Sequence, residues 1–375
     1  MAEQTKKKVY ILYPDGILSY SPTVLNLYDT LSTEFDVTVF SYEPDKYFTD
    51  ERPGNANVYY IKRAKLVERV IYATAYFLGT TIFGLPKIGR FKFKRQAKLY
   101  LLLKFKKKAD AIIAVDLSSL WVAQKISDNV HLVSLEIYEN DPFLPSIRKE
   151  KIKSVIIQSR VRYQYYFPNE DVRVFYVQNA PIFRALKQPK EKKGLLYNGT
   201  AVPEFGIIQC INFIKYFREF VLTIKGAVPE AVKKIIESEY GDLISAKNIT
   251  IDKTYLASSQ LIEYISRFRI GFCFYDLSFE KINTFNYITA PSGKLFAYLA
   301  AGVPVIGNNI PGLHILEETN CGVLINDITP ENILSAIQKI ESNYDIISAN
   351  CVRVAAEFSF DKKITPFIEF LKKTT

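Results

Sequence analysis

Short apolar runs of strand length alternate with helix-length segments along almost all of the 375 residues, and this alternation restricts the fold more than any other feature. Buried strands separated by helices are typical of parallel sheets that carry helices on both faces. In the first half we predict strands at 9–14, 36–40, 57–61, 111–116, 131–136, 154–159 and 172–177. The second half starts the pattern again, with predicted strands at 194–199, 220–226, 248–252, 270–275, 304–307 and 322–327. The sequence therefore predicts an α/β protein with two Rossmann-like, doubly wound domains.

The boundary between the two series lies at 178–194, where prolines and a cluster of charged residues separate them. We predict one domain at 1–180 and a second at 181–358. Open parallel sheets bind ligands at the carboxyl ends of their strands, so we expect a ligand in a cleft that the two domains face.

The composition fits an ordered globular protein, with 48% hydrophobic and 23% charged residues. The apolar run before Pro14 is too short for the core of a signal peptide, so we expect a cytoplasmic protein. The four cysteines are far apart in the sequence and show no Cys-x-x-Cys pair. We therefore expect buried thiols rather than a zinc site or disulfides.

The stretch 291–312 reads as a short helix, a stop and a buried strand. Ser292 can cap a helix that begins near Gly293, and Gly302 can end it. Lys294 falls in the first turn, where a cation faces the positive end of the helix dipole at a cost of up to ~1 kcal/mol. An anion near this turn would remove that cost. The alternatives are that Lys294 bends into solvent or pairs with Glu280.

Three loops at predicted strand ends surround one phosphate-sized space. Gly199 and Gly226 each follow a strand, where glycine lets backbone amides approach a ligand closely. The third loop is the fifteen-residue connection 276–290, which is long enough to suggest a function.

The block NYITAPSGKLFAYLAAGVPVIGNNIPGLHILEETNCGVLI resembles the nucleotide-binding domain of GT-B glycosyltransferases. It is most similar to family 4, a group of mostly retaining, nucleotide-sugar-dependent enzymes of bacterial surface glycan synthesis. Weaker similarities extend to LLYNGTAVPEFG, to LTIKG, to residues 9–42 and to FSFDKKITPFIEFLKK. The resemblance implies that 1–180 binds the acceptor, that 181–358 binds the nucleotide sugar, and that a terminal helix at 359–375 crosses back to the first domain. The donor-binding residues that it implies are Gly199, Thr200, Lys225, Gly226, Tyr275, Asn286, Ser292, Gly293, Lys294 and Leu295.

Four positions depart from the family pattern. The two glutamates that usually lie eight residues apart align with Thr289 and Ala297, and the arginine and lysine that commonly hold the diphosphate align with Thr200 and Phe205. The candidates for diphosphate binding are then Lys294, Lys225 and the amino terminus of the helix at Gly293. Backbone amides at a helix start and a lysine in a partly dry site stabilise the charge that a departing nucleoside diphosphate gains.

We expect no cofactor and no metal. Asp-x-Asp, the usual carboxylate clamp for a divalent cation on a sugar nucleotide, occurs nowhere in the chain. The only histidines, His131 and His314, are far apart in the sequence, and we interpret both as structural.

In the acceptor half, the loop 14–22 follows the first strand and contributes Asp15, Gly16 and Ser19. Further carboxylates lie at predicted strand ends, at Asp116, Glu136 and Glu139. The catalytic candidates are Asp15, Asp116 and Glu136, any of which could orient an acceptor hydroxyl or act as a base. The family resemblance favours retention of the anomeric configuration, while an inverting route would need a base, for which Asp15 is placed best.

The segment 62–108 concentrates the positive charge of the protein. It holds fourteen Lys or Arg and one Glu, a net charge of +13 against +10 for the whole chain. Within it, 70–86 has 17 uncharged residues, which is at the lower limit for spanning a bilayer, and we interpret it as interfacial. Basic flanks beside apolar faces suit an anionic membrane surface, which places the protein peripherally on the inner face of the cell membrane. Nucleic acid is the competing partner, but no base-stacking motif accompanies the charge.

We therefore predict a metal-independent glycosyltransferase that moves a sugar from a nucleotide donor to a lipid-linked or growing surface glycan, of the lipopolysaccharide, capsule or exopolysaccharide type. One alternative is a sugar-nucleotide epimerase of the same fold. The other is a subunit that binds a glycan or nucleotide without catalysis.

Overall fold

The structure is a computed structural model that describes residues 6–14, 18, 21–43, 57–62, 66–81, 90–106, 108–254, 256–282 and 284–375. The chain divides into two compact units. Unit 1 comprises Met1–Gln178 together with Asp361–Thr375, and unit 2 comprises Asn179–Phe360.

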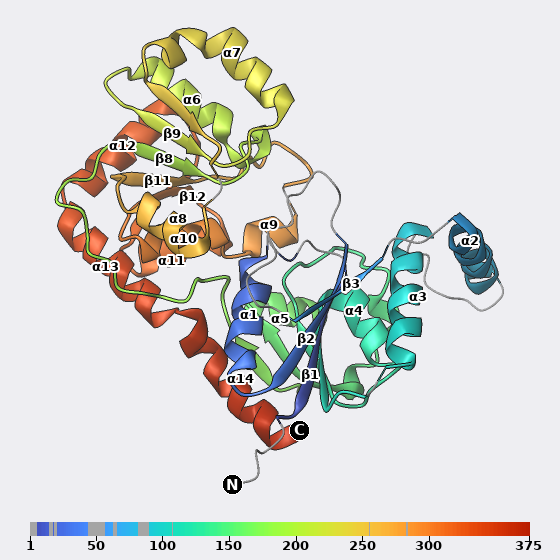
Figure 1. The fold of residues 1–375 in the computed structure, drawn as a ribbon. Helices are drawn as coiled ribbons and strands as arrows, with labels where there is room; N and C mark the ends of the chain where they lie inside the picture. The colour runs from blue at the N-terminus through green and yellow to red at the C-terminus, as the bar shows by residue number, and fades with distance from the viewer. Residues whose placement is uncertain are drawn as a thin grey trace. The chain divides into compact units, whose positions relative to one another are not determined.

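Unit 1 is built on a seven-stranded parallel sheet with the order β3-β2-β1-β4-β5-β6-β7 (Figure 1). Its strands are β1 (Lys8–Tyr13), β2 (Asp36–Tyr42), β3 (Val58–Ile61), β4 (Ala111–Val115), β5 (Val130–Val133), β6 (Ile152–Ile157) and β7 (Val174–Tyr176). Its helices are α1 (Pro22–Ser32), α2 (Leu66–Thr81), α3 (Arg90–Lys104), α4 (Asp116–Ala123), α5 (Arg160–Tyr166) and α14 (Phe360–Thr374). Each predicted strand of the first half overlaps a strand of this sheet.

Unit 2 repeats the plan on a six-stranded parallel sheet with the order β10-β9-β8-β11-β12-β13. Its strands are β8 (Leu195–Asn198), β9 (Leu222–Lys225), β10 (Ile249–Asp252), β11 (Ile270–Cys273), β12 (Val305–Asn308) and β13 (Gly322–Ile325). Its helices are α6 (Ile207–Tyr216), α7 (Glu230–Ser245), α8 (Ser258–Ile265), α9 (Phe285–Thr289), α10 (Gly293–Ala300), α11 (Ile315–Glu318), α12 (Pro330–Glu341) and α13 (Tyr344–Glu357). The predicted class, two Rossmann-like parallel-sheet domains, is confirmed.

The terminal helix α14 packs on the sheet of unit 1. Phe367 and Phe370 form edge contacts with the ring of His131, which is buried and hydrogen-bonded to Ser154 Oγ at 2.8 Å. Burial lowers the pKa of His131 to about 4, so the imidazole is neutral. The interpretation of His131 as structural agrees with this environment.

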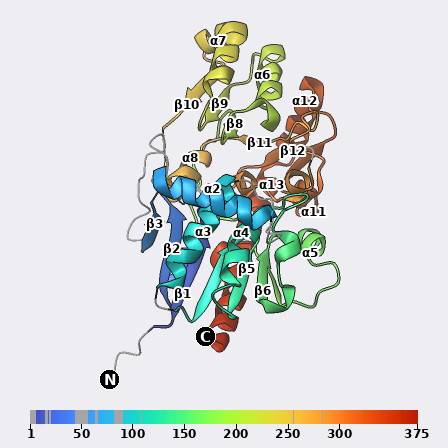
Figure 2. The same cartoon turned by 90° about the vertical axis from the view of Figure 1, so that its right-hand side faces the viewer.

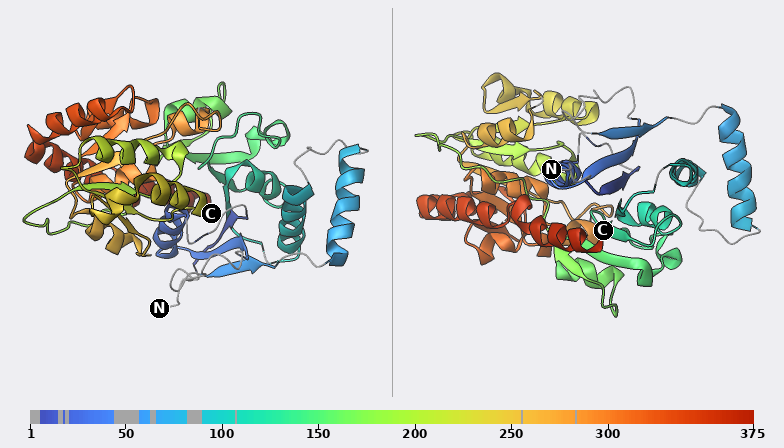
Figure 3. Two further views of the ribbon diagram at one scale, coloured as in Figure 1. Left: turned by 90° about the horizontal axis from the view of Figure 1, so that it is seen from above. Right: turned by 60° about the horizontal axis from the view of Figure 1, so that its bottom comes forward.

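Helix α2 lies farther from the sheet of unit 1 than its neighbour α3 does (Figure 3). Both views of Figure 3 place α3 between α2 and the sheet, and Figure 2 shows α2 crossing in front of α3. The two helices are joined by an ion pair between Glu68 and Lys98 at 3.2 Å. No helix in the described part of the chain is both long and apolar enough to cross a membrane.

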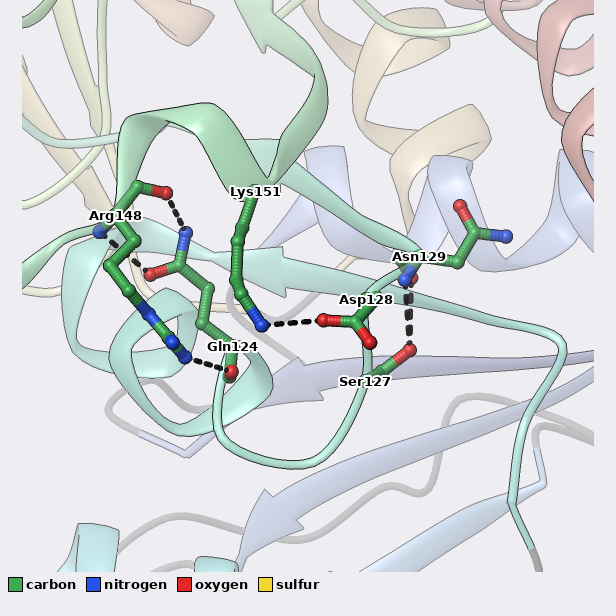
Figure 4. A network of polar contacts seen from close by, with 6 residues as sticks. All are labelled: Gln124, Ser127, Asp128, Asn129, Arg148 and Lys151. Carbon is green, nitrogen blue, oxygen red and sulfur yellow. Dashed lines mark hydrogen bonds and ion pairs between the residues drawn. The ribbon is translucent and has the colours of Figure 1, made fainter.

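A polar network ties the loops that precede β5 and β6 to the end of α4 (Figure 4). Gln124 Nε2 donates to the carbonyl of Arg148 at 2.7 Å, and the Arg148 amide donates back to Gln124 Oε1 at 3.0 Å. Lys151 pairs with Asp128 at 2.5 Å. These contacts hold the edge of the sheet that carries the amino ends of its strands.

In unit 2, the side chain of Tyr298 joins α10 to the central strand β8. Its hydroxyl donates to the carbonyl of Leu196 at 3.0 Å and accepts from the amide of Asn198 at 2.8 Å. Gly271 in β11 leaves the space for this ring, because a Cβ there would lie 2.4 Å from it. These contacts fix where the first turn of α10 stands relative to the end of β8.

We predict that Tyr298→Phe lowers the free energy of unfolding by about 1–3 kcal/mol, because a buried amide and a buried carbonyl lose their partner. Urea unfolding measures this. Tyr216→Phe is the control, since Tyr216 is a tyrosine of the same unit that is 70% exposed. Equal stability of both variants and the wild type would contradict this role of Tyr298.

Candidate functional site

The loops after β8 and β9 pack backbone against backbone. Gly226 has φ +130°, and a Cβ there would lie 2.5 Å from the carbonyl oxygen of Gly199. Gly199 has φ +121°, and a Cβ there would lie 2.7 Å from Lys294 Cε. The Gly199 amide donates to the carbonyl of Lys225 at 2.8 Å, and the Gly226 amide donates to the carbonyl of Asp252 at 3.0 Å. Glycine is therefore required at both positions because a side chain would not fit. The two backbone amides are hydrogen-bonded within the protein and are not available to a ligand, contrary to the prediction from the sequence.

Helix α10 begins at Gly293, as predicted, with Ser292 at the N-cap position. The side chain of Ser292 makes no capping hydrogen bond. The first amides of a helix have no partner within the helix. Among the described residues, none accepts a hydrogen bond from the amides of Gly293, Lys294 or Leu295. The first turn of α10 thus presents uncapped donors.

The side chain of Lys294 lies against aromatic rings. Its Nζ is 4.4 Å from the centre of the Phe205 ring and 5.3 Å from that of Tyr197. No carboxylate in the described part of the chain pairs with it, so the alternative pairing with Glu280 is not formed. Burial lowers the pKa of Lys294, which means that the ammonium has lost hydration without gaining a counter-charge.

Lys225 has such a counter-charge. Its side chain is 3% exposed, pairs with Asp252 at 3.0 Å and donates to the carbonyl of Thr254 at 2.6 Å. Burial alone would raise the pKa of Asp252, but hydrogen bonds from the Thr254 amide, Lys225 and Tyr264 lower it strongly. The positive charge of Lys225, which we predicted as a second phosphate ligand, is therefore balanced by Asp252 within unit 2.

The remaining predicted donor residues differ in their burial. Tyr275 is nearly buried beside the Phe205 ring, and its amide donates to Asn308 Oδ1 at 3.0 Å. Thr200 is exposed at the start of its loop, while Asn286 is nearly buried in α9. Phe205 is a residue that sequence reasoning missed, because it was considered only as the loss of a family lysine.

In unit 1 the structure brings two predicted catalytic candidates together. Asp116 follows β4 with φ +60°, a strained value for a residue with a side chain. Its Oδ1 accepts the amides of Leu135 at 2.7 Å and Glu136 at 3.1 Å. Strand β4 thus ends one residue earlier than predicted, and Asp116 holds the loop after β5 through these two hydrogen bonds. In this loop Glu136 is exposed, and Glu139 lies three residues further on.

Sequence reasoning also missed Arg162, which is fully buried beside this loop. Its Nη2 donates to the carbonyl of Leu135 at 2.9 Å and its Nε donates to Gln158 Oε1 at 2.8 Å. Burial lowers the pKa of Arg162, and the carboxylates of Glu136 and Asp116 oppose this shift. A buried arginine in a helix of mixed polarity gives little sequence signal.

The acceptor-side candidates Asp15, Gly16 and Ser19 lie outside the described residues. Within the residues that are described, no group of three or more His, Cys, Asp or Glu side chains could hold a metal ion. The four cysteines are buried free thiols, as predicted.

No protein-family model matches the sequence, and no curated protein matches it. Solved structures are similar along the whole chain. Anabaena HepE, in a complex with UDP and glucose, has a TM-score of 0.67 at 12% identity and covers 98% of this chain and 100% of its own. An α,α-trehalose 6-phosphate synthase from Burkholderia multivorans has a TM-score of 0.63 at 10% identity and covers 98% of each chain.

The pneumococcal O-GlcNAc transferase GtfA, in a complex with UDP and GlcNAc, has a TM-score of 0.57 at 13% identity. It covers 75% of this chain and 60% of its own. At these identities the likeness shows the fold, which is the GT-B fold, and the fold predicted from the resemblance is confirmed.

We predict that Asp252→Asn destabilises unit 2 by about 1.5–3 kcal/mol, because Lys225 then loses a charged hydrogen-bond partner. The folded pKa of Asp252 is depressed, so its contribution is complete above the unfolded pKa of about 3.9 and disappears as the pH falls below it. Unfolding of both proteins at neutral and acid pH measures this.

The control is Asp242→Asn, which removes an exposed ion pair with Arg218 in the same unit. We expect this control to unfold like the wild type. If Asp252→Asn also unfolded like the wild type at neutral pH, the ion pair between Lys225 and Asp252 would not stabilise unit 2.

Proposed function

We propose that the protein is a glycosyltransferase whose unit 2 binds a nucleotide sugar, with the diphosphate at the first turn of α10. The observation that carries this proposal is Lys294. Its ammonium is partly dehydrated, has no carboxylate partner among the described residues and lies beside the uncapped amides of the helix start. An anion bound there would stabilise the ammonium and the amides together. The printed ligands of the structural neighbours, UDP with glucose or with GlcNAc, support a nucleoside diphosphate as that anion.

The arrangement suits the chemistry of sugar transfer. When the bond between sugar and phosphate breaks, negative charge develops on the departing diphosphate. Lys294 and the amides of Gly293 and Leu295 then interact more strongly with the diphosphate than before the bond broke, which lowers the barrier. No metal is required in this scheme, because the charge is balanced by the lysine and the helix terminus.

For the acceptor we propose a lipid-linked or growing surface glycan, bound by unit 1 at the inner face of the cell membrane. The proposal draws on the resemblance of 286–325 to the family 4 glycosyltransferases and on the basic segment 62–108. Glu136 and the strained Asp116 at the carboxyl ends of the unit 1 strands are the described candidates for orienting an acceptor hydroxyl. We propose that transfer retains the anomeric configuration.

The loss of the two family glutamates, at Thr289 and Ala297, supports a second candidate, a subunit that binds a nucleotide or glycan without catalysis. The Thr289 hydroxyl donates to the carbonyl of Phe285 at 2.5 Å. Assays of sugar release with UDP-sugars, with and without glycan acceptors, separate this candidate from the transferase.

We predict that Lys294→Ala weakens UDP binding by about 1.5–3 kcal/mol, or about 10–150-fold in Kd, because a charged contact to phosphate is lost. Isothermal titration calorimetry measures it. Lys233→Ala is the control, since Lys233 lies on α7 and pairs with Glu237. An unchanged affinity in Lys294→Ala would remove the diphosphate from this place.

We also predict that the product keeps the anomeric configuration of the donor and that Asp15→Asn lowers turnover only modestly, by disturbing the acceptor. Proton NMR of the anomeric signal and steady-state rates measure the two effects. An inverted product, together with a rate loss beyond ~10⁴-fold in Asp15→Asn, would identify Asp15 as the catalytic base of an inverting enzyme.

A further inference from the structure

Several apolar side chains of helix α2 are exposed among those that the structure describes. Val70 is 62% exposed, Ile71 59% and Phe77 60%, and Leu78 is exposed as well. In a helix, residues three, four and seven positions apart share one face, so these four side chains and Thr74 form one continuous exposed strip. We call this strip the outer face of α2.

The opposite side of α2 is turned toward α3 and is more polar. Glu68 on this side forms the ion pair with Lys98. Tyr72 follows one turn later, half-buried, and its pKa is raised by burial and by the charge of Glu68. This arrangement is the reverse of an ordinary surface helix, which buries its apolar side and exposes its polar side.

Apolar exposure continues beyond the contact between the helices. Leu101 is exposed in the last turn of α3, and Phe105, which directly follows the helix, is 82% exposed. Lys104 and Lys108 are exposed between and after them. Exposed aromatic and cationic side chains therefore also occur at the carboxyl end of α3, in the same unit as the outer face of α2.

Some cations of the segment are already engaged by the protein. Lys106 Nζ lies 3.9 Å from the centre of the Tyr59 ring, and the Arg95 guanidinium lies 4.9 Å from that of Tyr42. These ring contacts restrict the two side chains but leave their charges in place. The net charge of +13 therefore remains available to attract an anionic partner, in addition to the apolar face.

We propose that the outer face of α2 inserts into the headgroup region of an anionic bilayer, and that the exposed Lys104, at the end of α3, and Lys108, which follows it, contact lipid phosphates. An apolar helix face in a strongly basic segment matches such a surface in both polarity and charge. The helix lies in the surface, because α2 has 16 residues and no described helix can span a bilayer. The inference rests on the proposed function only for the identity of the acceptor, which would reach unit 1 from the same membrane.

The test is co-sedimentation of the full chain with phosphatidylcholine vesicles, with and without phosphatidylglycerol, at low and high salt and without any sugar nucleotide. We compare the wild type with three double variants. The first is Ile71→Gln with Leu78→Gln on α2, and the second is Lys104→Gln with Lys108→Gln. The third, the control, is Ile346→Gln with Val221→Gln, two exposed apolar residues of unit 2.

We expect the wild type and the control to sediment with anionic vesicles. The α2 variant should lose about tenfold or more in partitioning at both salt concentrations, because its loss is apolar. The lysine variant should bind less than the wild type at low salt and about as much as the wild type at high salt, because screening already removes the contribution of the lysines there.

Three outcomes would overturn the proposal. In the first, the wild type does not bind anionic vesicles, and in the second, the α2 variant binds them like the control. In the third, gel filtration shows a smaller oligomer for the α2 variant than for the wild type, which would assign the outer face of α2 to contact with a second copy of the chain. UDP calorimetry on the same variants keeps the two proposals apart. Loss of vesicle binding with normal UDP binding concerns the membrane face alone.

Discussion

The ammonium of Lys294 is a positive charge that unit 2 holds partly dehydrated, beside the positive end of a helix and without a carboxylate partner among the described residues. Much of the local structure keeps it there. Gly199 lacks the Cβ that would displace its side chain, and Tyr298 fastens α10 to β8 through two hydrogen bonds. An arrangement that is unfavourable in the free protein becomes favourable when an anion binds, and this is the physical basis of the proposed donor site.

The aromatic rings around Lys294 change how the site compares with the family that it resembles. Where the family commonly has a lysine, Phe205 places its ring 4.4 Å from the ammonium. A ring orients a cation and attracts it weakly, at about 0.5–2 kcal/mol, but adds no charge for a diphosphate. With Lys225 neutralised by Asp252, the described part of unit 2 offers a diphosphate Lys294 and the helix amides. We therefore expect this site to depend on one lysine more strongly than a site with three cations.

The sequence was sufficient for the parts of the structure that depend on local patterns. Apolar runs located every strand of the two sheets, and Ser292, Gly293 and Gly302 located α10, because strand burial and helix ends leave signatures within a few residues. What depended on contacts between distant segments was not predicted. The ion pair of Lys225 requires β9 and β10 to be neighbours in a particular register, and the burial of Arg162 requires the loop after β5 to close over it. Likewise, the sequence indicated an interfacial segment near 70–86 but not which face of α2 is exposed.

Hydrogen exchange of the wild-type chain with and without saturating UDP tests the central claim most directly, because it reports where the nucleotide binds without any substitution. The account predicts slower exchange in the first turn of α10, at 293–296, and in the loops after β8 and β9. The amides at 293–296 lie where the diphosphate would bind, and the loops after β8 and β9 lie next to this place. Exchange that is unchanged at 293–296 while UDP protects another region, or protects none, would contradict the account.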